Sequence, residues 1–305
     1  MERNIRIPWW AKMLAKIVLS RTHLPYTVWR RISFFKHGDM AAPAYAQQVF
    51  NKHFTAADFR RKNESFVAME IGPGDSLFSA VIAAAYGACR TYLIDAGRFA
   101  SAGASGYFSL GELLEADGRK PPAIRGMTTV DEIVSACNGV YGTKGLNSLS
   151  EIPSGSVDFI WSHAVLEHIG KAEFGDYMKQ LRRVLRDDGC ASHTVDLMDH
   201  LGGNLNNLRF SERVWESRFM ARSGFYTNRL RFSEMLELFR KAGFSVEVTK
   251  VTRWPTLPTP RRCLSRPFRD WPEDDLGVSG FDVVLKPCGP LQDGLGRSAG
   301  QRINE

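Results

Sequence analysis

Cysteine is scarce in the sequence, and its placement suits no structural role. The 305 residues include five cysteines, and no two of them form a CxxC pair: Cys89, Cys137, Cys190, Cys263 and Cys288. An odd number of scattered cysteines argues against a disulfide scaffold and a zinc knuckle, and it fits a reducing compartment. We therefore expect a cytoplasmic protein held together by its hydrophobic core.

Long apolar runs are also missing. No stretch is long and apolar enough to span a bilayer. The N-terminal run is broken by Lys12 and Lys16, and no small-residue cleavage site follows it, which argues against a signal peptide. The apolar residues of segment 1–21 recur at helical spacing, so we expect an amphipathic helix there. This helix either docks on the body of the protein or lies on an anionic membrane at its inner face.

What the sequence does contain is an alternation of strands and helices from residue 66 onward. This order predicts an α/β fold with a mostly parallel sheet, seven strands in all, covered by helices on both faces. No helix separates the last two strands, so one of them should be antiparallel. A helix over 171–189 should end at Gly189, and one over 231–243 at Gly243. The region after residue 95 reads as irregular, apart from a helix over 129–138.

The chain divides into three parts on this pattern. Residues 1–62 form an N-terminal helical extension, residues 63–290 the α/β domain, and residues 291–305 a flexible tail. Within the domain, residues 197–230 form a cap after the fifth strand. A Pro-rich insertion at 253–275, between the last two strands, is expected to cover the functional site.

The stretch "FVAMEIGPGDSLF" reads as a strand, a glycine turn and a helix start. Gly72 and Gly74 lack a Cβ atom, so the backbone can turn sharply and approach a ligand closely. Asp95 ends the next strand about 20 residues later, where a carboxylate can accept both hydroxyls of an adenosine ribose. The two features together predict a cofactor that contains adenosine.

The residues around the turn limit which cofactor can bind there. The phosphate-binding GxxxxGK[ST] motif is absent, and Leu77 stands where a dinucleotide site would have its third glycine. Glu70, just before the turn, would repel phosphates and suits a ligand with a positive end. S-adenosylmethionine (SAM) has an ammonium, a sulfonium and no phosphate, so we expect this cofactor.

These residues carry a family resemblance. "MEIGPGDS", Asp95 and "SLSEIPSGSVDFIWSHAVLEHI" resemble the motifs of class I SAM-dependent methyltransferases, methyltransferase type 11 among them, over about residues 66–290. The resemblance implies a Rossmann-like fold and methyl transfer. It also implies that Asn147 and Ser148 lie near the adenine and that Ser162 and His163 shape the cofactor pocket.

Methyl transfer to a hydroxyl benefits from a general base. We expect His200 to be that base, with Asp196 orienting it, and we expect His200 rather than His163 to limit the chemical step. The side chains of His193, Asp196, Asp199 and His200 could also form a metal site. Strand alternation sends His193 and Asp196 to opposite faces, so we expect no metal there.

The cap should select the acceptor. Amides and a flat aromatic ring suit a sugar, and arginines suit a phosphate or carboxylate, which makes four cap residues candidates: Asn207, Arg209, Tyr226 and Arg229. The cap and the N-terminal segment resemble methyltransferases of bacterial surface-polysaccharide gene sets. This likeness implies a small-molecule or glycan acceptor, favouring a sugar hydroxyl in cell-envelope polysaccharide biosynthesis.

Two other function classes stay open. The net charge of +7 permits an RNA substrate, although no NPPY tetrapeptide follows the fourth strand, where "SHAV" stands. We expect no stable nucleic-acid partner. A catalytically idle binding protein is the other alternative, and the intact set of Glu70, Gly72, Gly74 and Asp95 argues against it. The sequence leaves the oligomeric state undecided.

Overall fold

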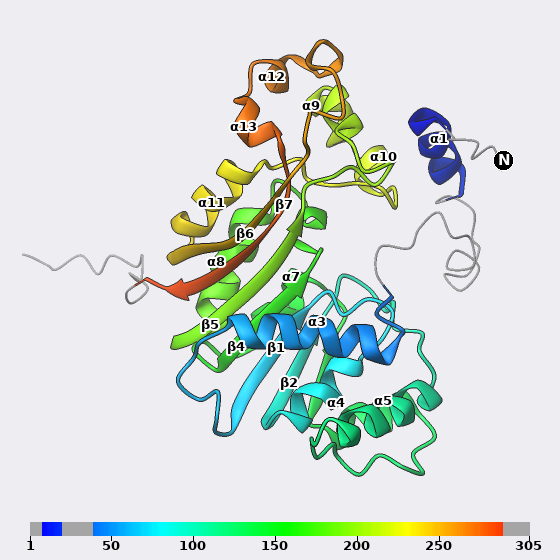
Figure 1. Cartoon of the computed structure of the whole chain (residues 1–305), viewed down its shortest axis with the longest axis vertical. Coiled ribbons are helices and arrows are strands. Elements are labelled where there is room, and N and C mark those ends of the chain that lie inside the picture. Colours follow the sequence, from blue (N-terminus) through cyan, green and yellow to red (C-terminus); the bar gives the residue numbers. More distant parts are fainter. Residues whose placement is uncertain (1–7, 20–38, 289–305) are drawn as a thin grey trace, which may run out of the picture.

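A single sheet organises the molecule (Figure 1). The computed structural model describes residues 8–19 and 39–288. Its seven-stranded sheet has the order β3-β2-β1-β4-β5-β7-β6. Every pair is parallel except β5–β7 and β6–β7, so β7 is the antiparallel strand. The strands are β1 (Phe66–Ile71), β2 (Ala88–Ile94), β3 (Gly139–Gly142), β4 (Val157–His163), β5 (Leu185–Asp196), β6 (Phe244–Arg253) and β7 (Val278–Pro287). The predicted fold is confirmed.

Alternating side chains of the strands build two cores, one on each face of the sheet. Phe66 and Ala68 of β1 pack into the cluster on the face that carries α3 (Pro43–Ala56), α4 (Phe78–Ala85), α5 (Ala104–Ala116) and α6 (Val130–Ala136). Met69 and Ile71 of β1 pack into the cluster on the face of α7 (Leu146–Ser150), α8 (Phe174–Val184) and α11 (Phe232–Lys241). Burial on both faces explains the near-continuous apolar runs of the central strands.

Helix α3 belongs to the core, although it precedes the first strand. Its Phe50 is fully buried and contacts the rings of Phe159 and Trp161 edge-on, with ring centroids 6.2 and 5.2 Å apart. Its His53, on the same buried side, is 1% exposed. Helix α3 of the N-terminal extension is therefore part of the cover on one face of the sheet.

The cap lies beyond the carboxyl end of β5. It contains three short helices, η3 (Asn206–Arg209), α9 (Glu212–Trp215) and α10 (Arg218–Ala221). Helix α1 (Trp9–Leu19) packs on it through Trp9, Met13 and Ile17, which join a cluster built on Trp215 and its cap neighbours. The described part of the predicted amphipathic helix therefore docks on the body of the protein.

The Pro-rich insertion differs from the prediction in what it covers. It carries η4 (Arg261–Cys263), α12 (Arg266–Arg269) and α13 (Glu273–Leu276). Its Leu264 and Phe268 pack against Leu205 and Leu208 of the cap. The insertion thus supports the cap from outside, near the top of Figure 1.

Two local predictions are wrong. The region after Asp95 contains the 13-residue helix α5, whose Tyr107, Leu110 and Leu114 are fully buried at helical spacing. Helix α8 ends at Val184 rather than at Gly189, because β5 already begins at Leu185. Gly189 lies inside β5, where a Cβ atom would come within 2.9 Å of the Asp158 carbonyl oxygen. That glycine serves a close approach of β4 and β5 and does not stop a helix.

Several expectations fall outside the described residues. They concern the tail at 291–305 and the ends of the N-terminal segment, residues 1–7 and 20–21. None of the helices in the described part of the chain has both the length and the apolar character needed to cross a membrane.

Candidate active site

The glycine turn, residues 72–74, joins β1 to α4 at the carboxyl edge of the sheet. Gly72 and Gly74 have φ angles of +70° and +66°, which residues with a Cβ atom rarely adopt. A Cβ atom on Gly72 would lie 2.5 Å from Cγ2 of Val165, in the segment that follows β4. The Gly72 N–H donates to the Ile94 carbonyl at 2.8 Å. The turn is therefore clamped between the ends of β2 and β4.

Asp95 follows β2 and faces this turn. One carboxylate oxygen accepts the N–H of Gly74 at 3.2 Å, and the other accepts the N–H of Ala96 at 2.7 Å. Burial raises the pKa of Asp95 from its ordinary value of 3.8, and the two N–H donors oppose that shift. Each carboxylate oxygen keeps a further acceptor position, which fits a ribose diol.

Glu70 lies beneath the turn and is 2% exposed. Burial raises its pKa to about 8. Among the described residues, its Oε2 atom has no hydrogen-bond partner. A buried carboxyl oxygen without a partner is costly. A cationic ligand near the turn would relieve that cost, so the residues present fit the positively charged end predicted for the cofactor.

The loop after β3 lies next to Asp95. The Asp95 N–H donates to the Gly142 carbonyl at 2.8 Å, and the Gly145 N–H donates to the Asp95 carbonyl at 2.9 Å. Ser148 is buried, and its Oγ accepts the N–H of Lys144 at 3.0 Å, whereas Asn147 is exposed. The predicted adenine neighbours are thus on the loop beside the ribose acid, and their contact with adenine stays a prediction.

A cavity of about 500 Å³ opens at the carboxyl ends of β4 and β5, and we name it the strand-end cavity. It is lined by Lys16, Met40, Tyr45, His163, Ala164, His168, Thr194, Asp196, His200 and Gly224. Ser76 of the α4 entry donates to the Met40 carbonyl at 2.5 Å, which connects the cavity to the glycine turn. Ala164, with a φ angle of +55°, ends β4 in a strained conformation.

His163 projects toward α3 and meets a second imidazole there. Its Nδ1 atom lies 3.3 Å from Nε2 of His53, and Nδ1 of His53 lies 2.9 Å from Oγ of Ser192. Burial lowers the pKa of both histidines, and that of His53 falls well below its ordinary value. Both rings are therefore neutral near pH 7, and His163 is able to accept a proton.

Ser162 points to the other face of β4. It is fully buried, and its Oγ is 2.7 Å from Nδ1 of His193. Burial lowers the pKa of His193 to about 3, so this ring stays neutral. The geometry gives no support to the prediction that the Ser162 side chain touches the cofactor. It confirms that His193 and Asp196 face opposite ways, since Asp196 lines the strand-end cavity.

His200 and Asp196 both reach the strand-end cavity, as expected for groups near an acceptor. Asp196 accepts the N–H of Met198 at 2.8 Å through Oδ1. Lys16 of α1 donates to the His200 backbone carbonyl at 2.7 Å. Burial, followed by repulsion from Lys12, lowers the pKa of Lys16 to about 8. Helix α1 therefore contributes a wall of the cavity.

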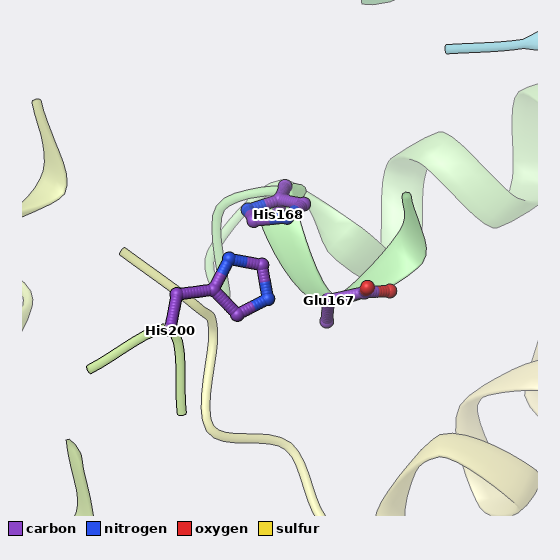
Figure 2. Close-up of side chains that lie close together, drawn as sticks. All are labelled: Glu167, His168 and His200. Carbon is purple, nitrogen blue, oxygen red and sulfur yellow. The ribbon is translucent and has the colours of Figure 1, made fainter. Parts of the chain in front are cut away.

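Glu167 and His168, in the short helix η2 (Leu166–His168), lie next to His200 (Figure 2). The rings of His168 and His200 meet edge-on with centroids 4.7 Å apart. Burial, followed by repulsion from Asp196, raises the pKa of Glu167 well above its ordinary value. The sequence analysis did not identify Glu167 as a neighbour of His200.

The four cap residues predicted to bind the acceptor hold the cap together instead. Asn207 donates to Thr227 Oγ1 at 3.0 Å, and the Tyr226 hydroxyl donates to Glu216 at 2.6 Å. Arg229, 4% exposed, donates to the Phe210 carbonyl at 2.8 Å. Arg209 donates to Asn206 at 2.9 Å. None of the four lines the strand-end cavity, so the geometry gives no support to direct contact with the acceptor.

The sequence analysis missed Lys16, Tyr45 and His53. One signal could have found His53: in α3 it lies three residues after Phe50 and seven after Ala46, on the apolar stripe of the helix, where a polar residue needs a buried partner. Lys16 had no such signal, because α1 meets the cavity only through tertiary packing.

Residues 135–192 match the sequence model of a methyltransferase domain family. That segment contains β3, β4 and most of β5. The carboxyl ends of these strands lie at the same edge of the sheet as the glycine turn and Asp95. Over this segment the chain is similar to that family. A search of curated protein sequences gave no significant match.

Solved methyltransferase structures resemble this chain at low identity. Phosphoethanolamine N-methyltransferase 2 of Haemonchus contortus is 13% identical, with 93% of this chain and 61% of that chain covered and a TM-score of 0.49. The 1,6-didemethyltoxoflavin-N1-methyltransferase of Burkholderia thailandensis is 14% identical, with coverage of 92% and 89% and a TM-score of 0.44. A methyltransferase in complex with the Trm112 activator of Haloferax volcanii is 15% identical, with coverage of 79% and 89% and a TM-score of 0.41.

The residues at the glycine turn fit S-adenosylmethionine, a cofactor that supplies an activated methyl group on a sulfonium. In the chain, Asp95 is suited to the ribose hydroxyls, and Gly72 and Gly74 let the backbone approach the cofactor. Glu70 would stabilise positive charge from below the turn. The predictions for these individual contacts are tested by the variants proposed below.

Proposed function

We propose that this protein is a SAM-dependent methyltransferase that transfers the methyl group to a hydroxyl of a small-molecule or glycan acceptor bound in the strand-end cavity. One observation carries the proposal: His163, His168 and His200 line this cavity, beside the segment that contacts the glycine turn. Methyl transfer to a neutral amine needs little beyond alignment, whereas a hydroxyl benefits from a nearby base. A cavity wall with several imidazoles suits the hydroxyl.

The reaction is an in-line displacement. The acceptor oxygen forms a bond to the methyl carbon as the carbon–sulfur bond breaks, and the hydroxyl proton passes to a base of the protein. Two imidazoles of the cavity can accept that proton. His200, with Asp196 nearby, is the base predicted from the sequence. His163 is the second candidate, because its hydrogen-bonded partner His53 orients it.

A sugar is the acceptor class that we favour, in cell-envelope polysaccharide biosynthesis. Besides the imidazoles, Thr194, Asp196 and Lys16 line the cavity, so its wall is polar. Tyr45 supplies a flat ring that meets the His163 ring edge-on, with the two ring centroids 6.4 Å apart. Polar groups next to an aromatic ring suit a carbohydrate better than an apolar molecule.

We also propose that the outer face of α1 binds the anionic inner face of the cell membrane. Trp10, Leu14 and Val18 follow one another at four-residue spacing and are 53%, 51% and 64% exposed. Lys12 adds a positive charge to the same short helix. An apolar stripe with flanking positive charge is typical of a helix that lies in a membrane interface. The opposite face of α1 remains docked on the cap.

The proposed function is tested with radiolabelled SAM and purified protein. Label should pass to nucleotide sugars or to cell-envelope glycan fractions, and Asp95→Ala should abolish the transfer at low SAM concentration. Label that passes to RNA, with binding that weakens steeply as salt rises, would favour the nucleic-acid alternative. Tight SAM binding by calorimetry without transfer to any fraction would favour an idle binding protein.

A further inference from the structure

The Glu167 cluster, which consists of Glu167, His168 and His200, combines three side chains that ligate metals. One ligand atom from each residue lies within 4.8 Å of the other two. Glu167 and His168 come from η2 after β4, and His200 comes from the cap after β5 (Figure 2). His168 and His200 also line the strand-end cavity, so the cluster is reached from the proposed acceptor site.

Glu167 gives an observation that is independent of this proximity. Its side chain is 1% exposed. Among the described residues, neither of its carboxylate oxygens has a hydrogen-bond partner. A carboxylate taken out of water without a donor or a cation costs several kcal/mol of stability in typical proteins. Either protonation of Glu167 or a cation bound at its carboxylate offsets this cost.

His168 is held as metal-bound histidines usually are. Its Nδ1 atom lies 2.9 Å from the Tyr226 carbonyl oxygen. A carbonyl can only accept, so Nδ1 carries the proton and Nε2 is the unprotonated ring nitrogen, the form in which a histidine ligates a metal. Histidines that bind metals typically donate their other ring N–H to a carbonyl or carboxylate, which fixes the ring and its tautomer.

The backbone under the cluster is fixed as well. The side-chain amide of Asn228 donates to the carbonyls of Leu166 and Ile169 at 2.9 and 3.0 Å, on either side of Glu167 and His168. The Asn228 N–H donates to the Glu167 carbonyl at 2.7 Å. Asn228 is 1% exposed. The cap therefore holds η2 in place through three hydrogen bonds from one residue.

We propose that Glu167, His168 and His200 bind a divalent transition-metal ion, with zinc as the best fit. Two imidazoles and one carboxylate are a ligand set that zinc takes in catalytic sites, which keep a further position open for water or substrate. Ligands about 2.1 Å from zinc in a tetrahedron lie about 3.4 Å apart, so the three atoms, which lie within 4.8 Å of one another, would close by up to about 1.4 Å through side-chain rotation. Asp196 adds negative charge on the cavity side.

For the reaction, this site deepens the proposed function and rests on it. A hydroxyl bound at the open position of the ion would lose its proton more readily. His200 would then be a ligand and could not serve as the base, which leaves His163, backed by His53, to take the proton. The site itself does not depend on the reaction, and its test is a binding measurement.

The test uses full-length protein stripped of metal with a chelator and titrated with Zn²⁺ by calorimetry. The wild type should bind one ion per chain and gain thermal stability. Glu167→Gln keeps the shape of the side chain and removes its charge, so it should fold and should lose zinc affinity about a hundredfold or more. His163→Gln, a change at another histidine of the same cavity, should bind zinc as the wild type does.

Cobalt absorption spectra separate this site from the free cysteines. Co²⁺ at nitrogen and oxygen ligands should give visible bands without the thiolate charge-transfer band that Cys89 or Cys288, both exposed, would produce. The proposal is overturned if the wild type binds no ion, if the bound ion shows thiolate absorption, or if Glu167→Gln and His200→Ala bind zinc like the wild type. SAM titrations of the same samples report on the cofactor site separately, so loss of one site is distinguished from loss of the other.

Discussion

The carboxylate of Asp95 accepts the backbone N–H of Gly74 at 3.2 Å, so the residue suited to the ribose also anchors the turn beneath the cofactor. Asp95→Ala removes both functions. We expect a loss of SAM affinity of about ten- to a hundredfold, since a charged hydrogen bond to a buried group contributes roughly 1.5–3 kcal/mol. Isothermal titration measures it. Asp95→Asn, which keeps an acceptor oxygen, is the matched control and should lose less. Unchanged affinity in folded Asp95→Ala would remove the ribose assignment.

Gly72 makes a second, steric prediction. A Cβ atom there would meet Val165 Cγ2 at 2.5 Å and would require a φ angle of +70°. Gly72→Ala should therefore lower stability by about 1–3 kcal/mol and weaken SAM binding, with urea unfolding as the measurement. Adding Val165→Ala should restore part of the loss, because it removes the clash and leaves the backbone strain. Full restoration would show that strain contributes nothing, and no restoration would show that the contact is not the cause.

Turnover should depend strongly on His200. His200→Ala is expected to lower kcat by about 10²–10⁴ on a hydroxyl acceptor, with SAM affinity near the wild-type value, because the side chain is on the acceptor side of the site. His163→Ala separates the two mechanisms. If His200 is the base, His163→Ala retains kcat and chelators leave the wild type active. If the Glu167 cluster binds metal, His163→Ala loses kcat as well and chelation inactivates the wild type. Normal turnover of His200→Ala would favour an amine acceptor.

Glu70 predicts a pH dependence of stability in the cofactor-free protein. Its folded pKa of about 8 lies above its ordinary value of 4.5, so the folded state holds a proton that the unfolded state releases. Its contribution to stability is complete below pH 4.5 and falls as the pH rises to 8, at up to about 1.4 kcal/mol per pH unit. Thermal unfolding of Glu70→Gln between pH 5 and 8 should show a flatter dependence than the wild type. Parallel curves would contradict the assignment.

The two faces of α1 should respond differently to substitution. Changing the outer residues Trp10, Leu14 and Val18 to serine should release the protein from anionic liposomes and leave its melting temperature unchanged. Ile17→Ala, on the docked face, should lower stability by about 1–2 kcal/mol and leave liposome binding intact. Sedimentation with vesicles and thermal melting measure the two effects. A wild type that does not sediment with anionic vesicles would end the membrane proposal.

Local sequence patterns were enough to predict much of the fold of this molecule. Strand alternation, the glycine turn and Asp95 predicted the sheet and the cofactor edge, because each feature depends on neighbours in sequence or on the strand-end rule for parallel sheets. Helix α5 was missed because its Gly106 and Gly111 disguise a periodic apolar face. Gly189 was misread because a glycine can serve a close contact between strands as well as a helix end.

Tertiary contacts decided what the sequence could not. Arg229 and Asn207 looked like ligands for an acceptor because they are polar and lie in the cap. The fold buries both and uses their hydrogen bonds to Phe210 and Thr227 to shape the cap. Lys16 lines the cavity and His53 contacts its wall residue His163, and each comes from a segment more than 100 residues away from the residue that it meets. No spacing rule connects such segments before the chain is folded.

The hydrogen bond from Lys16 to the His200 carbonyl makes the shape of the strand-end cavity depend on helix α1. A shortened protein that began at Asp39 would keep all seven strands and both cores of the sheet. It would nevertheless lose the wall that α1 supplies and admit water from that side. Such a truncation should therefore still bind SAM, while its transfer of methyl groups shifts from the proper acceptor toward wasteful hydrolysis or unselective alkylation.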